Sequence, residues 1–117
     1  MMDLSVVIVT WNTRELTATC VENLLGELEI AETRFGISSE VIVVDNGSSD
    51  GTADHLEECF GELRLVRLGQ NLGFAAGNNR GFRCARGRMI LLLNTGELNQ
   101  LRCKFIRIKR IKWILVL

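Results

Sequence analysis

The fold is decided by a stretch that reads EVIVVDNGSSDGT at residues 40–52. Residues 41–44 are all β-branched and apolar, and this unbroken run predicts a strand that is covered on both faces. Asp45 ends the strand, and the small polar residues that follow it predict a turn. A short helix is predicted over residues 52–60. One strand that leads through a turn into a helix is the repeating unit of an α/β fold.

The same unit recurs on both sides of this stretch. Residues 4–10 read LSVVIVT and predict a second strand that is apolar on both faces. Asn12 and Glu15 have the spacing of a capping box at the start of a helix. The remaining predicted elements are helices over residues 14–30 and 74–86 and strands over residues 63–68 and 89–93. Strands that alternate with helices predict an α/β protein with a doubly wound, parallel sheet of about four strands.

Ligands of such sheets bind beyond the carboxyl ends of the strands. That rule selects four polar or glycine-rich segments, at residues 10–12, 45–48, 69–73 and 94–97. Asp45 is placed there to accept hydrogen bonds from a base or a ribose, although Asp45 or Ser48 would also serve merely to satisfy N–H groups of the turn. Trp11 has two interpretations, as the lining of a pocket or as packing in the core or at its rim.

Length and composition predict a single globular domain with an acidic half and a basic half. The chain has 117 residues, 14 basic and 14 acidic, with 47% hydrophobic residues, which predicts one globular domain. Residues 1–62 carry 13 of the acids and residues 63–117 carry 12 of the bases. A basic half suits an anionic ligand, and mutual attraction of the two halves is the alternative.

Metal, disulfide and triad chemistry find little support. The four cysteines lie far apart, so we predict small, reduced core residues and neither a zinc site nor a disulfide framework. His55 is the only histidine and lies among acidic residues, so no triad based on histidine can be built. The apolar runs fall well short of the ~20 residues that span a bilayer, and no secretory leader is visible. We therefore predict a cytoplasmic protein.

Residues 71–81, NLGFAAGNNRG, are the most unusual stretch. Glycine costs about 1 kcal/mol relative to alanine inside a helix, so either a strand or a ligand must approach this backbone closely. Asn78, Asn79 and Arg80 supply donors suited to ribose and phosphate. The spacing matches neither the P-loop nor the G-x-G-x-x-G dinucleotide fingerprint.

Four ordered blocks resemble the N-terminal half of family 2 glycosyltransferases, especially rhamnosyltransferase-like members. They read LSVVIVTWN at 4–12, EVIVVDNGSSDGT at 40–52, NLGFAAGNNRG at 71–81 and GRMILLLN at 87–94. The resemblance implies a GT-A fold and transfer of a sugar, with inversion, from a nucleoside diphosphate donor of the UDP or dTDP type. It also implies Mg²⁺ or Mn²⁺, a saccharide or lipid-linked acceptor, and a place in polysaccharide biosynthesis.

The resemblance also suggests which residues contact the donor. Thr10 and Asn12 would border the nucleotide, and Asp45 would hold the nucleoside, with Asn46 at a position that is often a second Asp in relatives. The donor would lie along the start of the third helix. The residues that would allow this are Gly73, Gly77, Asn78 and Asn79.

The resemblance stops after the fourth strand. Relatives usually read Asn-Pro-Asp there, with a metal-binding Asp, whereas this chain reads Asn94-Thr95-Gly96 and places Glu97 one residue late. The half that carries the catalytic base is not matched. Our hypothesis is a truncated product, made by a frameshift or a premature end near residue 95, in which transfer is impaired or lost. A nucleotide-binding or interaction module without transfer activity is the alternative.

These boundaries divide the chain into a nucleotide-sugar-binding half of a GT-A domain at residues 1–97 and a tail at residues 98–117. The tail, LNQLRCKFIRIKRIKWILVL, is basic and apolar and does not match the family. It would contact an anionic membrane surface peripherally, act as a partner helix, or have no selected role. Nucleic acid is not an expected partner.

Overall fold

A six-stranded sheet forms the centre of the molecule, with the strand order β3-β2-β1-β4-β6-β5. The computed structural model describes residues 2–95, 104–108 and 112–116. The strands in these ranges are β1 (Leu4–Thr10), β2 (Ser39–Asp45), β3 (Arg64–Arg67), β4 (Met89–Leu92), β5 (Lys104–Ile108) and β6 (Lys112–Val116). The helices are α1 (Arg14–Phe35), α2 (Thr52–Cys59) and α3 (Phe74–Cys84).

Strands β1 and β2 are internal strands of the sheet, and most of their residues are buried. They pair in parallel along their whole length, from Leu4 opposite Ser39 to Thr10 opposite Asp45. Strands β4 and β3 continue the parallel sheet on either side. Both faces of β1 and β2 are covered, which is why their sequences are continuous apolar runs rather than alternating ones.

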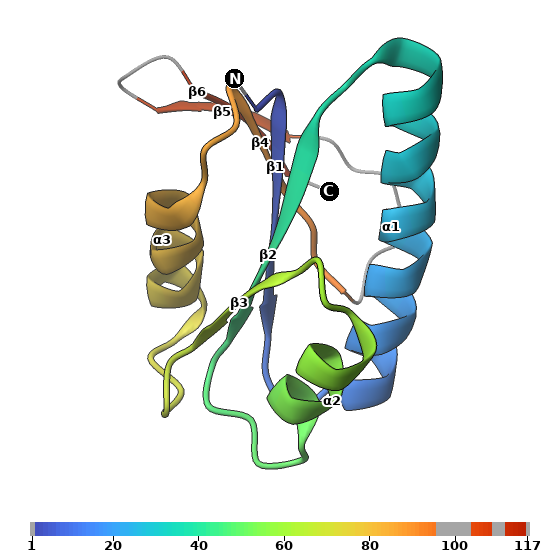
Figure 1. Ribbon diagram of the computed structural model, residues 1–117. Helices are drawn as coiled ribbons and strands as arrows, with labels where there is room; N and C mark the ends of the chain where they lie inside the picture. Colours follow the sequence, from blue (N-terminus) through green and yellow to red (C-terminus); the bar gives the residue numbers. More distant parts are fainter. Residues whose placement is uncertain (1, 96–103, 109–111, 117) are drawn as a thin grey trace.

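The helices form a layer on each face of the sheet (Figure 1). Helices α1 and α2 cover one face, where Val6 and Ile8 of β1 pack with Cys20 of α1 and Leu56 of α2. Helix α3 covers the other face, beside Val7. The predicted doubly wound α/β fold is therefore confirmed. Helix α1 is longer than predicted, because no helix-breaking residue stands between residue 30 and Gly36, which takes the left-handed conformation at φ 66°.

Helix α3 lies close to β1 at two glycines. A Cβ atom on Gly77 would lie 2.8 Å from Cγ1 of Val9, and one on Gly81 would lie 2.3 Å from Cγ1 of Val7. The glycines in this helix therefore serve the packing of helix against strand, which was one of the two explanations that the sequence allowed.

Two strands of the C-terminal region extend the sheet beyond the four that were predicted. Strand β6 pairs in parallel with β4, and β5 pairs with β6 in the antiparallel sense. These two segments are strands, so they do not form the partner helix considered above; residues 96–103, 109–111 and 117 lie outside the described residues. The division of the chain at residue 97 stays a prediction. None of the helices that the structure describes is long and apolar enough to cross a membrane.

The cysteines divide between core and surface. Cys20 is fully buried, and burial raises the pKa of its thiol, since the thiolate would be desolvated. Cys84 is half-buried, but Cys59 is exposed at the end of α2, so the prediction of a core residue is wrong there. All three are free thiols, and Cys103 lies outside the described residues.

Candidate functional site

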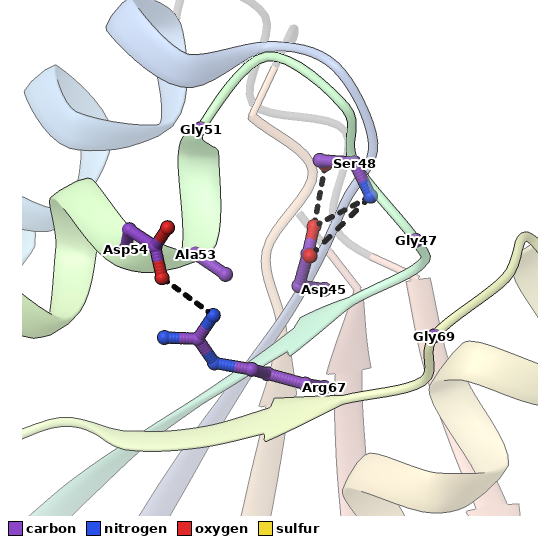
Figure 2. Close-up of a pocket in the computed structure, with 8 residues that line it drawn as sticks. All are labelled: Asp45, Gly47, Ser48, Gly51, Ala53, Asp54, Arg67 and Gly69. Atoms are coloured by element: carbon purple, nitrogen blue, oxygen red, sulfur yellow. Dashed lines mark hydrogen bonds and ion pairs between the residues drawn. The ribbon is translucent and has the colours of Figure 1, made fainter.

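A polar pocket of about 210 Å³ lies at the carboxyl end of β2 and β3 (Figure 2). This is the edge of the sheet where the sequence predicted the ligand. Eight residues line the pocket: Asp45, Gly47, Ser48, Gly51, Ala53, Asp54, Arg67 and Gly69. They come from the end of β2, the turn after it, the first turn of α2, and β3 with the loop that follows.

Asp45 places a nearly buried carboxylate in this pocket. The residue is 4% exposed and ends β2. Its Oδ1 accepts a hydrogen bond of 2.5 Å from the Ser48 hydroxyl, and the Ser48 N–H lies 3.3 Å from Oδ2. A carboxylate has about four acceptor positions, so acceptor capacity is left on the pocket side. Asp45 satisfies the turn, as one interpretation of the sequence had it, and it also lines the pocket, while its contact with a base or ribose stays a prediction.

Asn46 links the end of β2 to the loop before α3. Its side-chain Oδ1 accepts from the Leu72 N–H at 2.9 Å, and its Nδ2 donates to the Gly73 carbonyl at 3.0 Å. Its own N–H donates to the Thr10 carbonyl at 2.9 Å. Asn46 is 3% exposed, and two hydrogen bonds within the protein engage its amide, so it positions the loop rather than presenting a free group to a ligand.

Asn12 links the loops that follow β1 and β2. It has a left-handed backbone, with φ 50°, and its Oδ1 accepts from the Ser49 N–H at 2.8 Å. The Asn12 N–H donates to the Ser48 hydroxyl at 2.9 Å. Ser48 thus contacts both Asn12 and Asp45. The predicted capping box is wrong, because the N-cap residue of α1 is Thr13, which makes no side-chain capping bond.

Asp50 provides the caps instead, and it does so for two helices. Its Oδ2 accepts from the Arg14 N–H at the start of α1 at 3.1 Å. Its Oδ1 accepts from the Thr52 N–H at 3.1 Å and from the Thr52 hydroxyl at the start of α2. The Thr52 hydroxyl bond, with the backbone N–H groups of Arg14 and Thr52, lowers the pKa of the Asp50 carboxyl. One carboxylate therefore fixes the approach of both helices to the site.

Thr10 points away from the pocket, into α1. Its hydroxyl lies 2.7 Å from that of Thr17 and 3.0 Å from that of Thr13. Thr10 is 2% exposed and Thr17 is fully buried. The three hydroxyl groups bond to one another and anchor β1 to the first turns of α1. The side chain of Thr10 therefore holds the start of α1 in place and does not line the pocket.

The predicted residues around the start of α3 have different surroundings. Gly73 precedes the helix and is exposed, with φ 91°. Gly77 is packed against β1, and a Cβ there would also lie 3.6 Å from Nδ2 of Asn46. Asn78 is buried and Asn79 is exposed. None of the four lines the pocket around Asp45, so their predicted contact with the donor stays a prediction.

Arg67 and Asp54 line the pocket but were missed in the sequence. Arg67 donates from Nη1 to Oδ1 of Asp54 at 2.7 Å and from Nη2 to Oε2 of Glu57 at 2.5 Å. Asp54 first and then Glu57 raise the pKa of the Arg67 guanidinium. Only the register of β2 and β3, which places Arg67 beside Asp45, brings this arginine to the site, and no motif marks it.

In the loop after β4, the described side chains that could ligate a metal ion carry neutral oxygen atoms, not carboxylates. Asn94 is exposed and Thr95 is buried, while Gly96 and Glu97 lie outside the described residues. Mg²⁺ and Mn²⁺ sites normally include at least one carboxylate. Within the part of the chain that the structure describes, no three His, Cys, Asp or Glu side chains gather closely enough to hold a metal ion. The described residues therefore do not fit a metal site at this loop.

Trp11, the residue after β1, is 52% exposed. Packing inside the core is therefore wrong, while packing at the rim of the core stays a prediction. The indole lies outside the lining of the pocket around Asp45.

Comparison with known proteins identifies the family. A family model described as "Glycosyl transferase family 2" matches residues 5–95. The chain belongs to this family. The uncharacterized glycosyltransferase YfnE of Bacillus subtilis is 32% identical over 99 residues, which are 83% of this chain and 24% of that protein. The dodecaprenyl-phosphate galacturonate synthase of Rhizobium johnstonii is 31% identical over 101 residues, 83% of this chain and 28% of that protein.

Solved glycosyltransferases share the fold. The Pyrobaculum calidifontis mannosyltransferase PcManGT, solved with GDP-Man and Mn²⁺, superimposes with a TM-score of 0.62 at 26% identity, over 79% of this chain and 27% of that one. S. aureus TarS 1–349, solved with UDP-GlcNAc, gives a TM-score of 0.60 at 28% identity, over 80% of this chain and 26% of that one. The predicted GT-A fold is confirmed. The chain spans about a quarter of the length of the relatives it matches.

Proposed function

We propose that this family 2 chain binds a nucleoside diphosphate sugar at the carboxyl edge of its sheet. We also propose that it forms the donor-binding half, residues 1–97, of an inverting glycosyltransferase. The single observation that carries the proposal is the Asp45 carboxylate, nearly buried, held by Ser48 and facing a pocket large enough for a nucleobase. Complexes of two structural neighbours with GDP-Man and UDP-GlcNAc support a nucleotide sugar as the ligand.

Asp45 would recognise the nucleoside as a hydrogen-bond acceptor. An N–H of the base or a ribose hydroxyl would donate to the acceptor positions that Ser48 leaves free. The diphosphate would extend over the loops after β1 and β3, where Asn12 and Gly73 are exposed. We propose UDP or dTDP as the carrier, in keeping with the rhamnosyltransferase-like sequence blocks.

We propose a saccharide or a lipid-linked molecule as the acceptor. A relative is named a dodecaprenyl-phosphate galacturonate synthase, which supports a saccharide or lipid-linked acceptor. Inversion requires a base that deprotonates the acceptor hydroxyl, and no residue of this chain is assigned to that role. A divalent ion would neutralise the departing diphosphate, but the described residues at β4 do not fit it, so we assign it no step.

A second candidate function is nucleotide binding without transfer by this chain alone. The observation that favours it is the sequence Asn94-Thr95-Gly96, which carries glycine where relatives usually carry a metal-binding Asp. Donor hydrolysis measured with Mn²⁺ separates the two candidates. Turnover by the isolated chain would contradict impaired transfer.

Calorimetric titration with UDP, dTDP and GDP tests the binding site. Asp45→Asn keeps one oxygen for Ser48 but removes the charge, and a hydrogen bond to a charged group is worth about 1.5–3 kcal/mol, so affinity should fall by roughly 10- to 100-fold. Glu22→Gln, an exposed residue of α1, is the matched control and should leave affinity unchanged. If the unchanged protein binds none of the three nucleotides, or if Asp45→Asn binds as tightly, the proposal is wrong.

A further inference from the structure

Arg67 and Asp45 are neighbours that carry opposite charges and yet form no ion pair with each other. They occupy the same register position on the adjacent parallel strands β3 and β2. Register partners point to the same face of a sheet, and neighbouring strands lie about 4.8 Å apart. An arginine side chain is long enough to reach a carboxylate at that separation. Their pairing would be the simplest arrangement of this edge of the sheet.

The structure has a different arrangement (Figure 2). The Arg67 guanidinium turns toward α2, where it bonds to Asp54 at 2.7 Å. It also bonds to Glu57, which the figure does not draw, at 2.5 Å. The Asp45 carboxylate bonds to Ser48 on the other side of the pocket. Both residues line the same pocket.

We propose that Asp54 and Glu57 are positioning residues that hold Arg67 away from Asp45 and so keep the nucleoside pocket open. Without them, Arg67 would turn across the pocket and pair with Asp45, which would occupy the acceptor and the volume that the ligand needs. This inference rests on the proposed function only in naming a nucleoside as the ligand. The competition between the three carboxylates for one guanidinium does not depend on the ligand.

The exposure of Asp54 and Glu57 sets how strongly they hold Arg67, and so how far ligand affinity should fall without them. The side chains of Asp54 and Glu57 are 76% and 70% exposed, so each ion pair favours its bound arrangement only by roughly two- to five-fold. Removing both therefore shifts the preference of Arg67 by about five- to twenty-fold. A ligand that binds only the open form loses affinity in proportion to the fraction that is open. If the open and closed forms are about equally populated in the unchanged protein, the expected weakening is about three- to ten-fold.

The test compares Asp54→Asn/Glu57→Gln with a control of equal charge, Glu58→Gln/Glu62→Gln, whose two residues are exposed and do not contact Arg67. Calorimetry with UDP should show affinity about three- to ten-fold lower in the first variant and unchanged in the control. Adding Arg67→Met to the first variant should restore the affinity, because no guanidinium remains to occupy the pocket. A merely structural loss would not be rescued by a third substitution.

A second measurement needs no nucleotide. Urea unfolding of Asp45→Asn, Arg67→Met and their combination gives the coupling between these two residues. We expect a coupling of about two-fold in the native background, and a coupling three- to ten-fold larger in the unfolding equilibrium constant once Asp54 and Glu57 are neutralised. Absence of coupling there overturns the inference, whatever UDP does.

The remaining outcomes are also decisive. If Arg67→Met alone weakens UDP binding as much as Asp54→Asn/Glu57→Gln does, Arg67 contacts the ligand directly and the inference is overturned. If the unchanged protein binds no nucleotide but the coupling appears as expected, the proposed function fails while the arrangement of Arg67 stands.

Discussion

Gly47 is the position where the two loops that frame the pocket touch, and its replacement by alanine should be costly. Gly47 has φ 80°, and a Cβ atom there would lie 2.6 Å from both the carbonyl carbon and Cα of Gln70 and 2.9 Å from the Asn71 nitrogen. These atoms are backbone, so a change of side-chain rotamer cannot relieve the contact. The substitution therefore acts through backbone strain and through collision of the two loops.

The two contributions can be separated by a matched variant. The left-handed conformation costs a residue with a Cβ about 1–2 kcal/mol, and forced overpacking adds roughly 1–3 kcal/mol. Gly36→Ala at the end of α1 carries only the first cost, because Gly36 has φ 66° with no atom within 4 Å of the added Cβ. We expect a loss of about 1–2 kcal/mol for Gly36→Ala and about 2–5 kcal/mol for Gly47→Ala.

Urea unfolding followed by circular dichroism measures both losses, with an unchanged m-value as the condition for comparing them. The Gly47→Ala protein should also bind UDP more weakly, since Gly47 and Gly69 line the pocket from the two loops that are pushed apart. If Gly47→Ala is no less stable than Gly36→Ala, the two loops do not touch as described and the reasoning is refuted.

Three further predictions concern the supports of the site. Asn46→Ala removes two hydrogen bonds and should cost about 1–3 kcal/mol in urea unfolding; unchanged hydrogen exchange of the Leu72 amide would contradict that role. Gly81→Ala should destabilise the protein by about 1–3 kcal/mol, because the added Cβ collides with β1. Gly26→Ala is the control, since Gly26 is exposed with free space around it, and it should stabilise the protein by about 0.5–1 kcal/mol. Equal effects of the two substitutions would show that α3 does not lie so close to β1. The fold lowers the pKa of the Asp50 carboxyl, so its contribution to the free energy of unfolding is complete above the unfolded pKa of about 3.9 and is lost as pH falls through the folded pKa. Asp50→Asn should therefore make the free energy of unfolding less dependent on pH below about pH 4. If that dependence is unchanged, Asp50 does not cap both helices.

Much of the fold could be predicted from the sequence, because its signals are local. The apolar runs of β1 and β2 specify strands buried on both faces, and the alternation of strands with helices specifies a parallel sheet. The same logic predicted the ligand edge and singled out Asp45, and a polar pocket that Asp45 lines lies at that edge. These conclusions need only the order of residues along the chain.

The direction and partners of the site side chains could not be predicted in the same way. Asn46 follows Asp45 directly, but its amide turns to Leu72 and Gly73, and the cap of α1 comes from Asp50, 36 positions along the chain from the N–H that it accepts. Such contacts depend on how distant loops meet.

Arg67 shows the difference most clearly. Nothing in the sequence around it marks a site, and it comes to lie beside Asp45 only because β3 pairs with β2 in one register. A shift of one residue would turn its side chain to the opposite face of the sheet. The sequence by itself therefore determined the sheet and the edge at which the Asp45 carboxylate ends its strand. Only the tertiary structure decided which charges surround that acceptor, because long-range strand pairing sets the neighbours across a sheet.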